Sequence, residues 1–74
     1  MPTIKEFGGF RICMYFADHG RPHFHIVGPD FEAKIAIEDL SVMAGEVPRR
    51  ARAALEWAEE NRAQLMDRWR EFSE

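Results

Sequence analysis

Apolar and polar residues alternate along three short stretches in the first half of the chain. From Phe10 to Phe16 every second residue is apolar, which is the period-2 pattern of a half-buried β-strand. The stretches 23–27 and 31–37 repeat this pattern, and short loops join all three. The pattern therefore predicts an antiparallel meander with one buried face and one largely polar face. The predicted buried face consists of Phe10, Ile12, Met14, Phe16, Phe24, Ile26, Phe31, Ala33, Ile35 and Ile37.

The segments on either side of these strands are less regular. Residues 3–7 have the composition of a short edge strand, and Gly8 and Gly9 are expected to break it. Residues 39–46 form a turn and a candidate fourth strand. We therefore expect a sheet of three or four strands over about residues 10–46.

The last third of the chain has apolar residues at helical spacing. Pro48 suits the first turn of a helix, and Asn61 is a suitable N-cap for a second one. The segment 48–73 is therefore one long helix or two short helices with a break near residue 61. Its apolar stripe would cover the open face of the sheet, which makes the expected fold a small α+β domain. The stripe consists of Ala51, Ala54, Leu55, Ala58, Leu65, Trp69 and Phe72.

Length and composition fit one folded domain, residues 1–74, with a thin core. The chain is 46% hydrophobic and 31% charged, and its single cysteine, Cys13, excludes an internal disulfide and fits a reducing cytoplasm. We expect no secretory leader and no membrane span, because no segment approaches about 20 apolar residues. A core this small favours a partner protein or a homo-oligomer. The net charge of −3 argues against general RNA or DNA binding.

All three histidines lie within seven positions, at the start of the second predicted strand. His23 and His25 are two positions apart, so both point to the non-core face. The apolar residues of two paired strands share a face only if paired residue numbers add up to an even value. With a sum of 38, His25 faces Cys13 and His23 faces Tyr15; with a sum of 40, His25 faces Tyr15. In either register these side chains form one patch.

Three interpretations of this patch stay open. It can be a contact surface for a partner protein, in which the histidines have no chemical role. It can be a catalytic site in which His23 or His25 is the general acid or base, assisted by Tyr15 or His19. It can also hold a divalent metal such as zinc through His19, His23 and His25, although the sequence establishes no cofactor.

Three arginines, Arg49, Arg50 and Arg52, cluster at the predicted start of the helical segment. Cations at a helix N-terminus oppose the helix dipole, so they gain nothing locally. Acidic neighbours such as Glu46 offset this effect, or the arginines contact RNA, DNA or an acidic protein. Both explanations stay open.

Several short motifs are spread over essentially the whole chain. They are Met-Pro-Thr-Ile at 1–4, Gly-Phe-Arg-Ile at 9–12, Met-Tyr-Phe at 14–16, Asp-His at 18–19, Pro-His-Phe-His at 22–25, Gly-Glu-Val-Pro at 45–48 and Leu-Glu-Trp-Ala at 55–58. In these motifs the chain resembles a bacterial family, domain of unknown function family 4160. Arg21 departs from the family pattern, which has a proline there, and predicts a less rigid loop.

The resemblance implies a small stand-alone protein. Such proteins are often encoded beside a second small protein of unknown function (family 2442), in arrangements similar to toxin–antitoxin pairs. Our leading hypothesis is therefore the interacting component of a toxin–antitoxin-like pair, which acts through protein–protein contact at the His23/His25 face and the arginine cluster. The alternatives are an RNase-like hydrolase and a metal-binding protein, so the sequence leaves open whether the chain is an enzyme.

Overall fold

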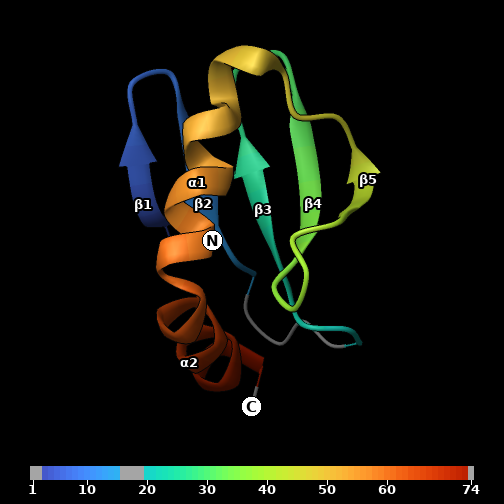
Figure 1. Ribbon diagram of the computed structural model, residues 1–74, viewed down its shortest axis with the longest axis vertical. Coiled ribbons are helices and arrows are strands. Elements are labelled where there is room, and N and C mark those ends of the chain that lie inside the picture. Colours follow the sequence, from blue (N-terminus) through green and yellow to red (C-terminus); the bar gives the residue numbers. More distant parts are fainter. Residues whose placement is uncertain (1–2, 16–19, 74) are drawn as a thin grey trace.

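The computed structural model describes residues 3–15 and 20–73. The predicted core residue Phe16 and the predicted ligand His19 lie outside these ranges. The described residues form a five-stranded antiparallel sheet, two helices and a short 3₁₀ turn (Figure 1). The elements are β1 (Thr3–Phe7), β2 (Phe10–Cys13), β3 (His23–Val27), β4 (Glu32–Ala36), β5 (Val42–Gly45), η1 (Arg49–Ala51), α1 (Arg52–Glu60) and α2 (Arg62–Ser73).

The strands follow one another in the order β1-β2-β3-β4-β5, so the predicted meander is confirmed. The predicted number of three or four strands is wrong, because β1 joins the sheet as a fifth strand. Gly8 and Gly9 do not end the sheet. They form the two-residue turn of a hairpin in which Phe7 pairs with Phe10, and Gly9 has a φ of +97°, a conformation that glycine adopts without strain.

The helical segment consists of two helices, as one of the two alternatives predicted. They meet at Asn61, whose main-chain carbonyl accepts from the N–H of Leu65 at 3.0 Å and so begins α2. The Asn61 side chain acts at the other helix. Its amide Nδ2 donates to the carbonyl of Trp57 at 2.8 Å, so it closes the end of α1. The predicted N-cap residue therefore serves both helices.

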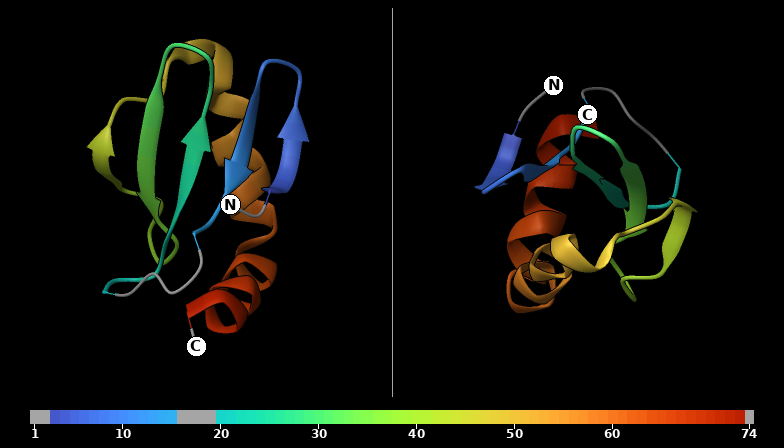
Figure 2. Two further views of the ribbon diagram at one scale, coloured as in Figure 1. Left: turned by 180° about the vertical axis from the view of Figure 1, so that it is seen from behind. Right: turned by 90° about the horizontal axis from the view of Figure 1, so that it is seen from above.

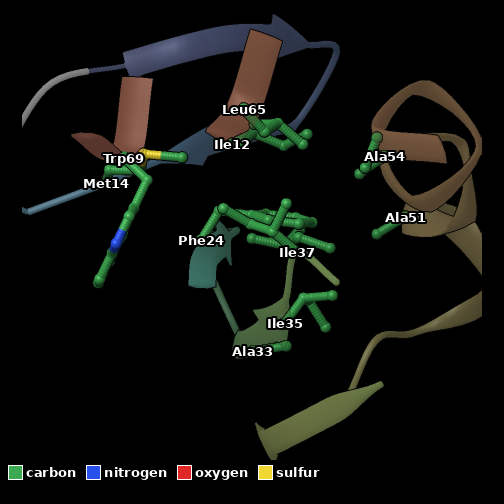
Figure 3. Packing of buried hydrophobic residues seen from close by; sticks show 12 residues of the cluster. Ile12, Met14, Phe24, Ala33, Ile35, Ile37, Ala51, Ala54, Leu65 and Trp69 are labelled. Carbon is green, nitrogen blue, oxygen red and sulfur yellow. The ribbon is translucent and has the colours of Figure 1, made fainter. Parts of the chain in front are cut away.

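The helices cover one face of the sheet, and we call the opposite side the outer face (Figure 2). The core lies between the sheet and the helices (Figure 3). Ala51, Ala54 and Ala58 are fully buried, and these small side chains allow the first helical turns to approach the sheet closely. The predicted stripe is confirmed at these residues and at Leu65 and Trp69. The sheet contributes Ile12, Met14, Phe24, Ile26, Ala33, Ile35 and Ile37.

Strand β5 is held against β4 by a close main-chain approach. Gly45 has a φ of +74°, and a Cβ at this position would overlap the main-chain carbonyl oxygen of Glu32. Gly9 also has a positive φ, but a Cβ there would meet nothing within 4 Å. The two glycines therefore separate the cost of backbone strain from the cost of a steric clash.

We expect Gly45→Ala to destabilise the protein by about 3 kcal/mol, because it adds a clash to an unfavourable backbone conformation. The matched variant Gly9→Ala should cost only about 1 kcal/mol, the strain alone. Urea denaturation followed by circular dichroism measures both. Equal losses in the two variants would contradict the close approach of β5 to Glu32.

Candidate functional site

Strand β3 is buried on both of its faces. Phe24 and Ile26 face the core, as predicted, and are fully buried. On the outer face His23 is only 2% exposed and His25 only 9% exposed. The outer face of β3 is polar, as predicted, but it is not exposed, because neighbouring side chains cover both imidazoles.

The register of the first two core strands decides between the two predicted pairings. Cys13 pairs with His25, and Ile12 pairs with Ile26, so the paired numbers add up to 38. The rings of His23 and His25 lie side by side, with their centroids 5.2 Å apart, which confirms that they share a face. The next strand places Lys34 opposite His25.

His23 lies where the lower end of the sheet meets α2. Its ring centroid is 4.9 Å from that of Trp69, and its Nδ1 is 2.7 Å from the main-chain carbonyl oxygen of Arg21. A carbonyl oxygen only accepts hydrogen bonds, so Nδ1 must carry the proton. The packing and this hydrogen bond are what allow a polar ring to be buried.

Arg21, which departs from the family pattern, anchors the loop before β3 through its side chain. Its guanidinium lies 3.4 Å from the carboxylate of Glu38 and 3.1 Å from that of Asp39. Two hydrogen bonds from Ser41 and, to a smaller extent, the guanidinium of Arg21 lower the pKa of the Asp39 carboxyl to about 2. The main-chain N–H of Ile37 also donates to Pro22 at 3.1 Å. The loop before β3 is thus attached to the turn between β4 and β5.

Glu32 connects the other histidine to Tyr15. The Tyr15 hydroxyl donates to Glu32 Oε2 at 3.1 Å, and the same oxygen lies 3.3 Å from His25 Nδ1. The Tyr15 and His25 rings pack edge to face, with their centroids 4.4 Å apart. Burial raises the pKa of Tyr15, and the hydrogen bond and charge of Glu32 raise it further, so the phenol stays protonated and donates. The sequence pattern did not identify Glu32 as the acceptor of the Tyr15 hydroxyl.

Cys13 completes the outer face next to His25. It is fully buried, and burial raises the pKa of its thiol, although the nearby Arg11 opposes this effect. A buried thiol with a raised pKa is a poor nucleophile. Cys13 therefore has the properties of the small apolar filler that the outer face needs at this position.

The outer face opens to solvent in a pocket of about 260 Å³ between β4 and β5. It is the place where His25 and Glu32 border a cavity. Lys34 adds a positive charge beside them. The pocket is lined by His25, Glu32, Ala33, Lys34, Ala44 and Gly45.

The predicted arginine cluster lies at the other end of the sheet. Arg50 forms an ion pair with Asp30 in the turn between β3 and β4, and its guanidinium lies 5.4 Å from the centre of the Phe31 ring. Figure 1 shows η1 near this turn, whereas His23 stands at the opposite end of β3. Arg49 and Arg52 are exposed. The arginines and the histidines therefore do not form one site.

The predicted metal set depends on a residue that the structure does not describe. Among residues 3–15 and 20–73, no three His, Cys, Asp or Glu side chains are grouped so that they could hold a metal ion. The set of His19, His23 and His25 includes a residue outside these ranges, so it stays a prediction. None of the described helices is long and apolar enough to cross a membrane.

We expect Glu32→Gln to lower the pKa of Tyr15, because the substitution removes the negative charge that disfavours the phenolate. Tyr15 is the only tyrosine in the chain, so the ultraviolet absorbance of phenolate follows it directly during alkaline titration. Glu38→Gln, an exposed carboxylate that does not contact Tyr15, is the matched control and should leave the titration unchanged. An unaltered Tyr15 titration in Glu32→Gln would contradict the hydrogen bond between Tyr15 and Glu32.

Comparison with known proteins identifies a family and no characterised relative. The family model described as a domain of unknown function (DUF4160) matches residues 9–70, which is most of the chain. No curated protein and no solved structure matches the chain.

Proposed function

We propose that this chain, which belongs to the DUF4160 family, is the interacting component of a cytoplasmic, toxin–antitoxin-like pair and acts by binding a partner protein. The family assignment itself identifies no activity. The proposal is supported by the surface around β5 and by the gene arrangement that the family resemblance implies.

One observation carries the proposal: two exposed, large apolar side chains are neighbours on one edge strand. Among the described residues, the large hydrophobic side chains that are exposed are Val42, at 50%, and Met43, at 37%. Single exposed apolar residues are ordinary on protein surfaces. Two in succession on a sheet edge, beside a pocket, are typical of a contact site.

The pocket beside β5 gives this surface a polar wall. His25 and Glu32 border the pocket from the sheet, and Lys34 stands next to the edge strand. An interface commonly surrounds an apolar centre with polar groups of this kind. The histidine patch thus contributes to the proposed contact through His25 at the pocket, while His23 supports the fold from within.

We expect the neighbour-encoded protein to form a one-to-one complex with this chain, and Met43→Glu to weaken the complex at least tenfold. The introduced carboxylate would have to lose water in the interface without a partner. Ala63→Glu adds the same charge at an exposed position of α2 and should leave the affinity unchanged. Isothermal titration calorimetry measures the affinities.

Two further variants test the surfaces that the sequence indicates. His25→Gln keeps a hydrogen-bonding side chain at the pocket, and Arg49→Glu combined with Arg52→Glu reverses the exposed arginines. Either variant should weaken binding less than Met43→Glu does. Full affinity in Met43→Glu, or no complex with the neighbour-encoded protein, would contradict the proposal.

A hydrolase is the second candidate function, and one contact favours it. A carboxylate beside Nδ1 of a catalytic histidine orients the ring, and Glu32 lies 3.3 Å from His25 Nδ1 at the pocket. Incubation of the purified protein with labelled RNA tests this function. Cleavage that disappears in His25→Gln would support it, and intact RNA would exclude it for that substrate.

A further inference from the structure

We propose that the partner supplies an extended segment that pairs with β5 as a sixth strand, and that this segment presents an acidic side chain to Lys34. The inference rests on the proposed function and specifies how the partner is held and which residue type it must carry.

The outer edge of β5 is available for pairing. In the strand order β5 has one neighbour, β4, and it forms the margin of the sheet in both views (Figures 1 and 2). All four of its residues, Val42–Gly45, are exposed. An edge strand presents main-chain N–H and C=O groups that another strand can bind, and in β5 the register shift at Met43 interrupts the regular row of these groups at one residue.

The two edges of the sheet differ in how they are protected. The other edge strand, β1, contains Lys5 and Glu6, and the ammonium group of Lys5 lies 5.9 Å from the centre of the Phe7 ring. Charged side chains on an edge discourage pairing with a foreign strand. Strand β5 consists of Val, Met, Ala and Gly and carries no charge. The contrast favours β5 as the edge that accepts a partner.

Lys34 gives the added strand its chemistry. It pairs with Ala44 across β4 and β5, so the two side chains share the outer face. Within the part of the chain that the structure describes, no carboxylate lies at ion-pair distance from Lys34, because Glu32 faces Tyr15 and His25 instead. A sixth strand would lie about 10 Å from β4. The small side chain of Ala44 leaves room for Lys34 to extend toward an acidic side chain on that strand.

Charge also argues against a second copy of this chain as the added strand. Asp39 precedes β5 and Glu46 follows it directly. If two copies paired antiparallel through β5 with Val42 opposite Gly45, β5 of the second copy would bring no carboxylate to Lys34, because β5 consists of Val, Met, Ala and Gly. A different protein with an acidic residue in an otherwise apolar segment fits the edge better.

Amide hydrogen exchange of the isotope-labelled chain, with and without the neighbour-encoded protein, tests strand addition directly. We expect exchange in residues 42–45 to slow at least tenfold in the complex at the alternate amides that point outward, while the amides of β1 stay unchanged. Lys34→Gln should weaken binding three- to tenfold and reduce its salt dependence. Lys5→Gln removes the chain's other lysine, on the opposite edge, and should have no effect.

The outcomes separate this inference from the proposed function. A complex that leaves residues 42–45 unprotected would overturn strand addition while the partner function stands, and absence of a complex would overturn both. If Lys34→Gln binds with full affinity and unchanged salt dependence, the proposal that the partner presents an acidic side chain to Lys34 is wrong. If the free protein forms a dimer, and Val42→Lys makes it monomeric, the sixth strand comes from a second copy of this chain and not from a different protein.

Discussion

The burial of β3 on both faces is the constraint on which the rest of this small sheet depends. An apolar strand meets that constraint by packing alone, but β3 carries His23 and His25 on its outer side. Each imidazole needs a polar neighbour inside the protein. The carbonyl of Arg21 and the carboxylate of Glu32 meet this need. The imidazoles of His23 and His25 therefore hold both the loop before β3, which carries Arg21, and the next strand, β4, which carries Glu32.

Glu32 links this buried centre to the edge where we propose that the partner binds. Its carboxylate joins Tyr15 to His25, and its main-chain carbonyl lies against Gly45 in β5. The position of β5, and the pocket beside it, thus depend on the residue that accommodates the histidine. In this account the histidines contribute to function mainly by shaping the sheet, and the exposed side of β5 makes the contact.

The alternation of residue types was sufficient to predict the three central strands, their shared core face and the two alternatives of register. Residues 3–7 were a candidate edge strand but were left out of the predicted sheet, because Gly8 and Gly9 indicate a break and a hairpin turn equally well. The burial of His23 could not be predicted, because a period-2 pattern shows which residues are polar and not which side chains cover them. The residue that covers His23 is Trp69, which comes from α2. The ion pair of Arg50 with Asp30 is equally a tertiary contact that no local pattern indicates.

His23 is a buried structural donor through Nδ1, and nitrogen NMR of its imidazole ring tests this assignment. Chemical shifts of the ring nitrogens distinguish a protonated Nδ1 from a bare one. We expect a proton on Nδ1 of His23, directed toward the main-chain carbonyl of Arg21. A bare Nδ1 on His23 near neutral pH would contradict this assignment and would make His23 a candidate base or metal ligand again.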